Sequence, residues 1–146
     1  MKNDNINLIL PKKYSIRIYR ISYFTFFSII TSYRLKLIDY TVLSIIVFIT
    51  SINYWRHPLN NYRRKIDISA VSIYLLYQNI NAIKYIKCYY YYFFIFTGLF
   101  CYYNAKNTKS YNKSSLWHCG LHICANISNI IFYNRLYELN NQLKNN

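Results

Sequence analysis

The residues most capable of chemistry in this sequence are three histidines and one aspartate near the ends of apolar segments. His118 and His122 are four residues apart, so on a helix their imidazoles project to the same side about 6 Å apart and can share one metal ion. His57 is the remaining histidine and the candidate third ligand. Zinc held by three histidines keeps a fourth position for water and lowers the pKa of that water toward about 7. Asp67 would then act as general base or orient a ligand.

A structural explanation of the same residues stays open. Histidines at the end of an apolar segment, with Trp117 beside them, can anchor a helix in the headgroup region of a membrane. Asp67 can cap its helix and pair with Arg63 or Arg64. The zinc site is therefore one of two interpretations of these residues.

The elements that must position these residues are apolar blocks without Lys, Arg, Asp or Glu. Hydrophobic residues make up 54% of the chain and charged residues 15%, against roughly 25% charged in soluble domains. Four blocks are within reach of the roughly 17 to 25 residues of a transmembrane helix: residues 40–55, 68–83, 88–105 and 114–134. A fifth, residues 21–33, crosses only if the flanking arginines extend to the headgroups. The sequence predicts an all-α fold, a polytopic transmembrane helix bundle of four or five spans, with β structure nearly absent.

The chain divides into one membrane domain and two tails. Residues 1–16 form a polar, basic N-terminal tail, residues 17–134 the transmembrane helical domain, and residues 135–146 an Asn-rich tail that we expect to fray. The four cysteines lack a C-x2-C spacing, so we expect free, buried thiols.

Basic residues predict the orientation of the bundle. With five spans, twelve of the 18 Lys and Arg residues fall on the side of the N-terminus, which the positive-inside rule assigns to the cytosol. The C-terminus then lies on the opposite side, and the sequon at Asn112 faces the cytosol and should carry no sugar. The net charge of +14 is dispersed over loops and tails, which indicates contact with anionic membrane lipids and not with nucleic acid.

Two stretches resemble a known family of membrane proteins. Arg56-His57-Pro58 to Arg64-Lys65-Ile66-Asp67 resembles the early motif of the alkaline ceramidases and the related progestin and adipoQ receptor proteins, and Leu116-Trp117-His118 followed by His122 is similar to the motif in their last helix. The resemblance implies a zinc-dependent hydrolase of a lipid amide in a seven-helix fold. That family has a serine four positions before the first histidine; here that position is Asn53, with Ser51 two residues earlier. The implied site has His57, His118 and His122 on zinc, Asp67 as acid and base, and Ser51 or Asn53 polarising the substrate carbonyl.

Three functions from different classes fit this sequence. The first is the lipid amide hydrolase. The second is a small membrane scaffold or a viroporin-like homo-oligomer, in which asparagines within the spans hydrogen-bond between helices: Asn79, Asn81, Asn126 and Asn129. The third is a protein that binds membrane lipids in the same pocket without catalysis. If zinc is bound, the three histidines should bring their nitrogens to roughly 3 to 4 Å from one another, with Asp67 in the same pocket.

Overall fold

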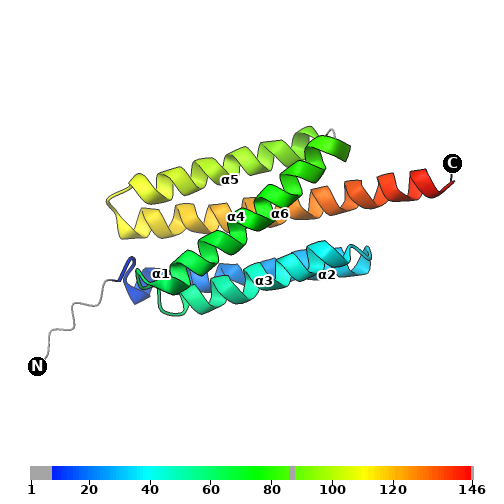
Figure 1. Cartoon of the computed structure of the whole chain (residues 1–146). Helices are drawn as coiled ribbons and strands as arrows, with labels where there is room; N and C mark the ends of the chain where they lie inside the picture. The colour runs from blue at the N-terminus through cyan, green and yellow to red at the C-terminus, as the bar shows by residue number, and fades with distance from the viewer. Residues whose placement is uncertain (1–7, 86–87, 146) are drawn as a thin grey trace, which may run out of the picture.

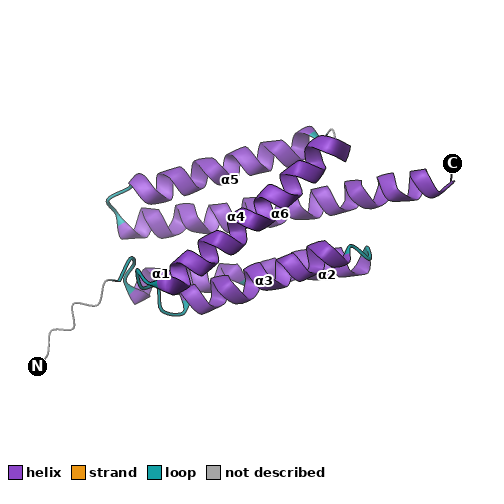
Figure 2. Ribbon diagram, viewed as in Figure 1, coloured by secondary structure: helices purple, strands orange, loops and turns teal. Residues whose placement is uncertain are grey.

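Six helices form one bundle in the computed structural model of the chain, which describes residues 8–85 and 88–145 (Figures 1 and 2). They are α1 (Lys12–Ser22), α2 (Thr25–Arg34), α3 (Ile38–Trp55), α4 (Tyr62–Tyr85), α5 (Tyr89–Asn107) and α6 (Tyr111–Asn145). Within the described ranges the β structure is limited to an isolated bridge between Leu8 and Leu59. The prediction of an all-helical fold is confirmed for these residues.

The short apolar block at residues 21–33 is divided between two helices that form an almost continuous rod. Tyr23 and Phe24, between α1 and α2, keep backbone angles of −64°, −18° and −60°, −23°, which are close to helical values. The Phe24 amide donates to the Ile21 carbonyl across this junction. Helix therefore begins at Lys12, inside the predicted polar tail, and the rod over residues 12–34 is roughly 34 Å long at 1.5 Å per residue.

Consecutive helices run up and down the bundle. In Figure 1, α5 and α6 lie side by side in one layer, α1 to α3 form a second layer, and α4 crosses diagonally. Contacts join α6 to α5, α1 and α2, and join α3 to α2, α1 and α4. The end of α3, the start of α4, the end of α5 and the start of α6 therefore meet at one end of the bundle, and we call this the Asp67 end.

Helix α6 is longer than the sequence predicts. It continues to Asn145, past the expected end of the apolar block at residue 134 and through the tail that we expected to fray. Buried Leu136 joins the hydrophobic cluster that contains Phe132 and Leu37, and Arg135 forms an ion pair with Glu138 at 2.7 Å. Packing and local charge pairing thus extend the helix beyond the apolar block.

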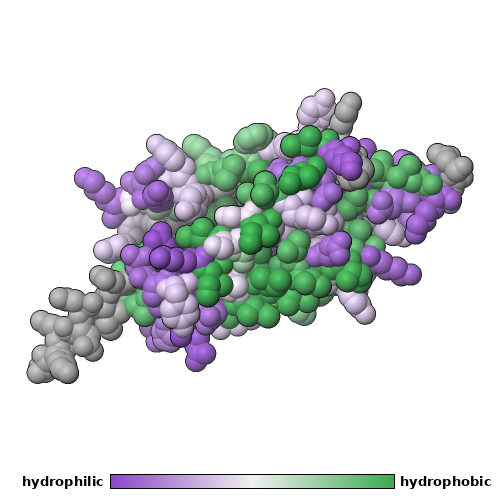
Figure 3. All heavy atoms as spheres, in the orientation of Figure 1, coloured by the Kyte–Doolittle hydropathy of each residue, from purple (hydrophilic) through white to green (hydrophobic). Residues whose placement is uncertain are grey.

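Burial in this bundle differs from that of a soluble domain, in which polar side chains are mostly exposed, because polar residues are about as numerous as apolar ones among its buried residues. Many buried residues are polar: Ser15, Ser22, Thr25, Ser28, Ser32, Thr41, Ser44, Ser51, Asp67, Gln78, Ser115, Asn126, Ser128 and Asn129. Large apolar side chains are exposed on every helix, among them Phe26, Phe27, Ile46, Ile73, Phe96 and Leu116. Hydrophobic residues accordingly cover much of the middle of the face in Figure 3.

One helix among the described residues, α3, is long and apolar enough to cross a membrane by length and composition. Tyrosine, asparagine and serine make α4, α5 and α6 less apolar than α3, although each is longer. A single such helix is weak evidence for a membrane protein, so the multi-pass topology stays a prediction at this point.

Candidate functional site

Asp67 is a buried carboxylate held by hydroxyl groups of the neighbouring helix. The Ser51 hydroxyl donates to its Oδ1 at 2.7 Å, and the Thr50 hydroxyl donates to the same oxygen at 3.3 Å. Both donors lie near the end of α3, where α3 packs against α4. The side chain of Asp67 is 7% exposed, so these two bonds fix its position at the interface.

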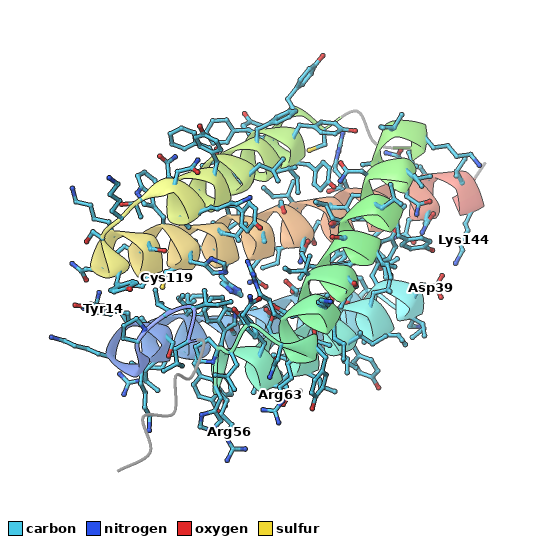
Figure 4. The ribbon with its side chains drawn as sticks, turned by 60° about the vertical axis from the view of Figure 1, so that its left-hand side comes forward. Tyr14, Asp39, Arg56, Arg63, Cys119 and Lys144 are labelled. Carbon is cyan, nitrogen blue, oxygen red and sulfur yellow. The ribbon has the colours of Figure 1, made fainter. Side chains whose placement is uncertain are left out.

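The expected ion pair between Asp67 and a neighbouring arginine is not found. Among the described residues the ion pair within 4.0 Å is Arg135 to Glu138, and the Arg64 guanidinium donates to Asn60 at 3.1 Å. Arg56 and Arg63 point outward from the Asp67 end (Figure 4). Asp67 is therefore a buried acidic group without a cationic partner in the part of the chain that the structure describes.

His118 and His122 lie one turn apart on α6, as their spacing predicts. Their ring centroids are 5.4 Å apart. The indole of Trp55, the last residue of α3, contacts His118 edge to face with centroids 4.6 Å apart. The Nε2 atom of His122 is buried and has no hydrogen-bond partner.

The structure does not bring His57 to this histidine pair. His57 is exposed in the turn after α3, where its amide donates to the Tyr54 carbonyl. Asn53 is also exposed. Within residues 8–85 and 88–145 there is no group of three His, Cys, Asp or Glu side chains that could hold a metal ion. Four residues of the predicted site do lie together, around one cavity: Ser51, Asp67, His118 and His122.

Trp55, four residues after Ser51, lies next to the histidine pair. The ring of Trp55 packs against that of His118, with the centroids 4.6 Å apart. An indole N–H is only a donor and cannot bind a metal ion through nitrogen. The described residues therefore do not fit a three-histidine zinc site.

Two cavities meet at this cluster. The inner cavity has a volume of about 120 Å³ and lies between α3, α4 and α6, with polar lining from Ser51, Gln78, His122, Asn126 and Asn129. The outer cavity, of about 310 Å³, lies at the Asp67 end and is lined by Arg64, Lys106, Tyr111 and Ser114, among others. Trp55, Asp67 and His118 line both cavities, so these three side chains separate the outer space from the inner one.

Hydrogen bonds join α6 to α2 beside the inner cavity, which is lined by Asn126 and Asn129. The Ser28 hydroxyl donates to Asn126 Oδ1 at 2.7 Å, and Asn129 donates to Ser28 at 3.4 Å. The expectation of asparagine bonds between helices is met by these two residues. Asn79 and Asn81 instead donate to carbonyls of their own helix.

Three residues of this region were missed by sequence reasoning. Trp55 was counted as part of an apolar block, and Thr50 carried no motif. Gln78 is 1% exposed, lines the inner cavity, and has an amide nitrogen without a partner. A lone glutamine inside an uncharged apolar block was a usable signal for Gln78, because polar residues within spans are expensive to bury.

No protein-family model, curated protein or solved structure matches this chain.

Proposed function

We propose that this chain is a multi-pass membrane protein that binds the polar group of an amphiphile in the paired cavities at Asp67, without catalysing its hydrolysis. The observation that carries the membrane assignment is the combination of exposed large apolar side chains with a partly polar interior. Monomeric soluble proteins rarely expose contiguous apolar patches beyond a few hundred Å², whereas this bundle exposes large apolar residues on all six helices. In a lipid bilayer these apolar side chains would contact lipid chains, which are also apolar.

The polar interior supports the same assignment. Helices in a membrane gain little from burying apolar side chains against one another, so they associate through small residues and interhelical hydrogen bonds. Serine is the commonest fully buried side chain here. Between α5 and α6 the contact is made by glycine and cysteine: a Cβ on Gly120 would lie 3.1 Å from the Cys101 sulfur, and one on Gly98 would lie 3.5 Å from the Cys124 Cβ.

Five crossings are consistent with the arrangement of helices. The α1–α2 rod and the helices α3 to α6 alternate in direction, so α1 begins and α6 ends at opposite ends of the bundle (Figure 1). With the cytosol on the side of the basic loops, the Asp67 end faces the cytosol. Asn112, in the sequon Asn112-Lys113-Ser114, should then stay unglycosylated in a membrane system that adds sugar on the opposite side. Sugar on Asn112 would contradict this orientation.

Binding without hydrolysis is favoured because the catalytic set is incomplete. The cavities hold polar groups with unused hydrogen-bonding capacity, namely the buried nitrogens of Gln78 and His122. Such groups are costly to bury without a partner, and a ligand can satisfy them. Trp55 in contact with His118 leaves two histidines, and two ligands fall short of the three that catalytic zinc sites use.

Photolabelling tests the binding proposal directly. A lipid with a photoreactive group beside its headgroup should label peptides that contain Trp55 or Asp67, and an excess of unlabelled lipid should abolish this labelling. Labelling confined to outward-facing residues such as Phe96, without saturation, would contradict a specific cavity. Replacing Gln78 by Leu, which removes the free amide, should reduce the saturable component, and Gln142→Leu on the exposed end of α6 is the matched control.

Zinc-dependent hydrolysis of a lipid amide is the second candidate. The bond from Ser51 to Asp67 and the neighbouring His118 and His122 favour it, because these groups line one cavity. Purified protein with one zinc per chain, lost in His122→Ala, together with turnover of a fluorescent ceramide would establish this function. Our proposal expects no turnover, and a metal content that does not depend on His122.

A further inference from the structure

Asp67 is the one buried acidic side chain among the described residues. Both of its hydroxyl donors, Ser51 and Thr50, bond to Oδ1. No described donor bonds to Oδ2, and no described cation lies within ion-pair distance. A buried carboxylate is costly unless a positive group or further donors compensate it. The protein thus presents an acidic group whose second oxygen is available to a ligand at the wall between the two cavities.

The charges of the two cavities are ordered by depth. The outer cavity is lined by exposed Lys106 and half-buried Arg64, and it also reaches buried Asp67. The inner cavity has no Lys or Arg in its lining. A ligand that enters from the Asp67 end therefore meets two cations first and a carboxylate afterwards.

We propose that the amphiphile is zwitterionic, with an ammonium group that reaches Asp67 and an anionic group, a phosphate or a carboxylate, held by Arg64 and Lys106. This inference rests on the proposed function. The ammonium donates to Asp67 Oδ2 and lies beside the indole of Trp55, an aromatic ring that attracts cations. The inner cavity, with a volume of about 120 Å³, has room for a short aminoalkyl group.

This arrangement explains why a ligand with one charge is a poor fit. A purely anionic amphiphile places nothing opposite Asp67 and leaves the carboxylate uncompensated. A purely cationic amphiphile satisfies Asp67 but leaves Arg64 and Lys106 to repel it during entry. Charge order therefore selects for a headgroup that carries both signs, with the cation at its tip, and against either single charge.

Fluorescence of Trp55 provides the test. The chain has two tryptophans, so the variant Trp117→Phe leaves Trp55 as the single reporter in purified full-length protein in detergent micelles. Three short-chain probes are compared: a phosphatidylethanolamine, a phosphatidylglycerol and an alkylamine. We expect a saturable change with the phosphatidylethanolamine and at least tenfold weaker binding of the other two.

Substitutions of the charged side chains test which residues bind the ammonium group and which bind the anionic group. Asp67→Asn should weaken phosphatidylethanolamine binding at least tenfold, and Arg64→Gln combined with Lys106→Gln should weaken it several-fold. Asp39→Asn, a carboxylate at the opposite end of the bundle (Figure 4), should bind as the parent does. If Asp67→Asn does not fold, the comparison of the three probes on the parent protein still decides the inference.

The possible results distinguish failure of the zwitterion inference from failure of the proposed function. Equal saturable binding of all three probes, or unchanged binding in Asp67→Asn, would overturn the zwitterion inference and leave amphiphile binding intact. Absence of saturable binding with every probe would overturn the proposed function as well.

Discussion

Helix α2 has two faces that differ in almost every physical property. Thr25, Ser28 and Ser32 are buried against the rest of the bundle, and Phe26 and Phe27, on the opposite face, are more than half exposed. In water this placement would leave the largest apolar side chains without hydrophobic stabilisation and would bury hydroxyl groups. In a bilayer it places small polar groups where helices meet and aromatic rings where lipid lies. The other helices also expose large apolar side chains while polar ones such as Ser44, Ser51 and Gln78 are buried, and this pattern favours the proposal that lipid surrounds the bundle.

A charge on the outer surface should have the largest effect. Ile46 lies near the middle of α3 and is 44% exposed. If this face contacts lipid, Ile46→Lys should cost about 3 to 4 kcal/mol of insertion free energy, because an unfavourable lysine replaces a favourable isoleucine. If Ile46 is exposed to water instead, the same substitution should change the free energy of unfolding by no more than about 0.5 kcal/mol. The fraction of chains that insert into microsomes measures the difference, with Ile46→Leu as control, and equal insertion of both variants would argue against a lipid-facing surface.

The inner polar contacts should come next in magnitude. Ser51→Ala removes the shorter of the two hydrogen bonds to buried Asp67, and loss of a bond to a charged group costs about 1.5 to 3 kcal/mol. Tyr77 donates to exposed Asp39 at 3.3 Å, so Tyr77→Phe should cost less than about 0.5 kcal/mol. Reversible unfolding in mixed micelles, followed by circular dichroism, compares the two. A similar loss in both variants would mean that Asp67 is no more strongly held than Asp39.

Close packing of α5 on α6 gives a smaller, local test. Gly120→Leu must displace the Cys101 sulfur, which would lie 3.1 Å from the added Cβ, and overpacking costs about 1 to 3 kcal/mol. Gly98→Ala meets the Cys124 Cβ at an ordinary contact distance of 3.5 Å and should be tolerated. Combining Gly120→Leu with Cys101→Ala should recover part of the loss. The midpoint of thermal aggregation in detergent ranks these variants, and no recovery in the double variant would place the strain elsewhere.

The helices could be predicted from the sequence because apolar blocks separated by short basic loops leave few alternatives. The start of helix at Lys12 could not, since basic residues carry no apolar signal there and the α1–α2 rod is held by contacts with α3 and α6. His118 and His122 share a face because their separation is local. His57 depends on how α3 ends: the helix stops at Trp55, and the next two residues turn out of the bundle. The end of α3 at Trp55 matches the predicted end of the apolar block at residue 55, but residue types alone do not show in which direction the chain continues after it.

The central claim, that the bundle lies in a membrane, is tested most directly by alkaline extraction of membranes from cells that express the full chain. High pH releases peripheral proteins and leaves proteins that span the bilayer in the pellet. The exposed apolar side chains predict that the chain stays with the membranes at high pH and enters solution only with detergent. Recovery of a folded, monomeric chain in the detergent-free supernatant would contradict the account, because the exposed apolar residues of all six helices would then have to face water.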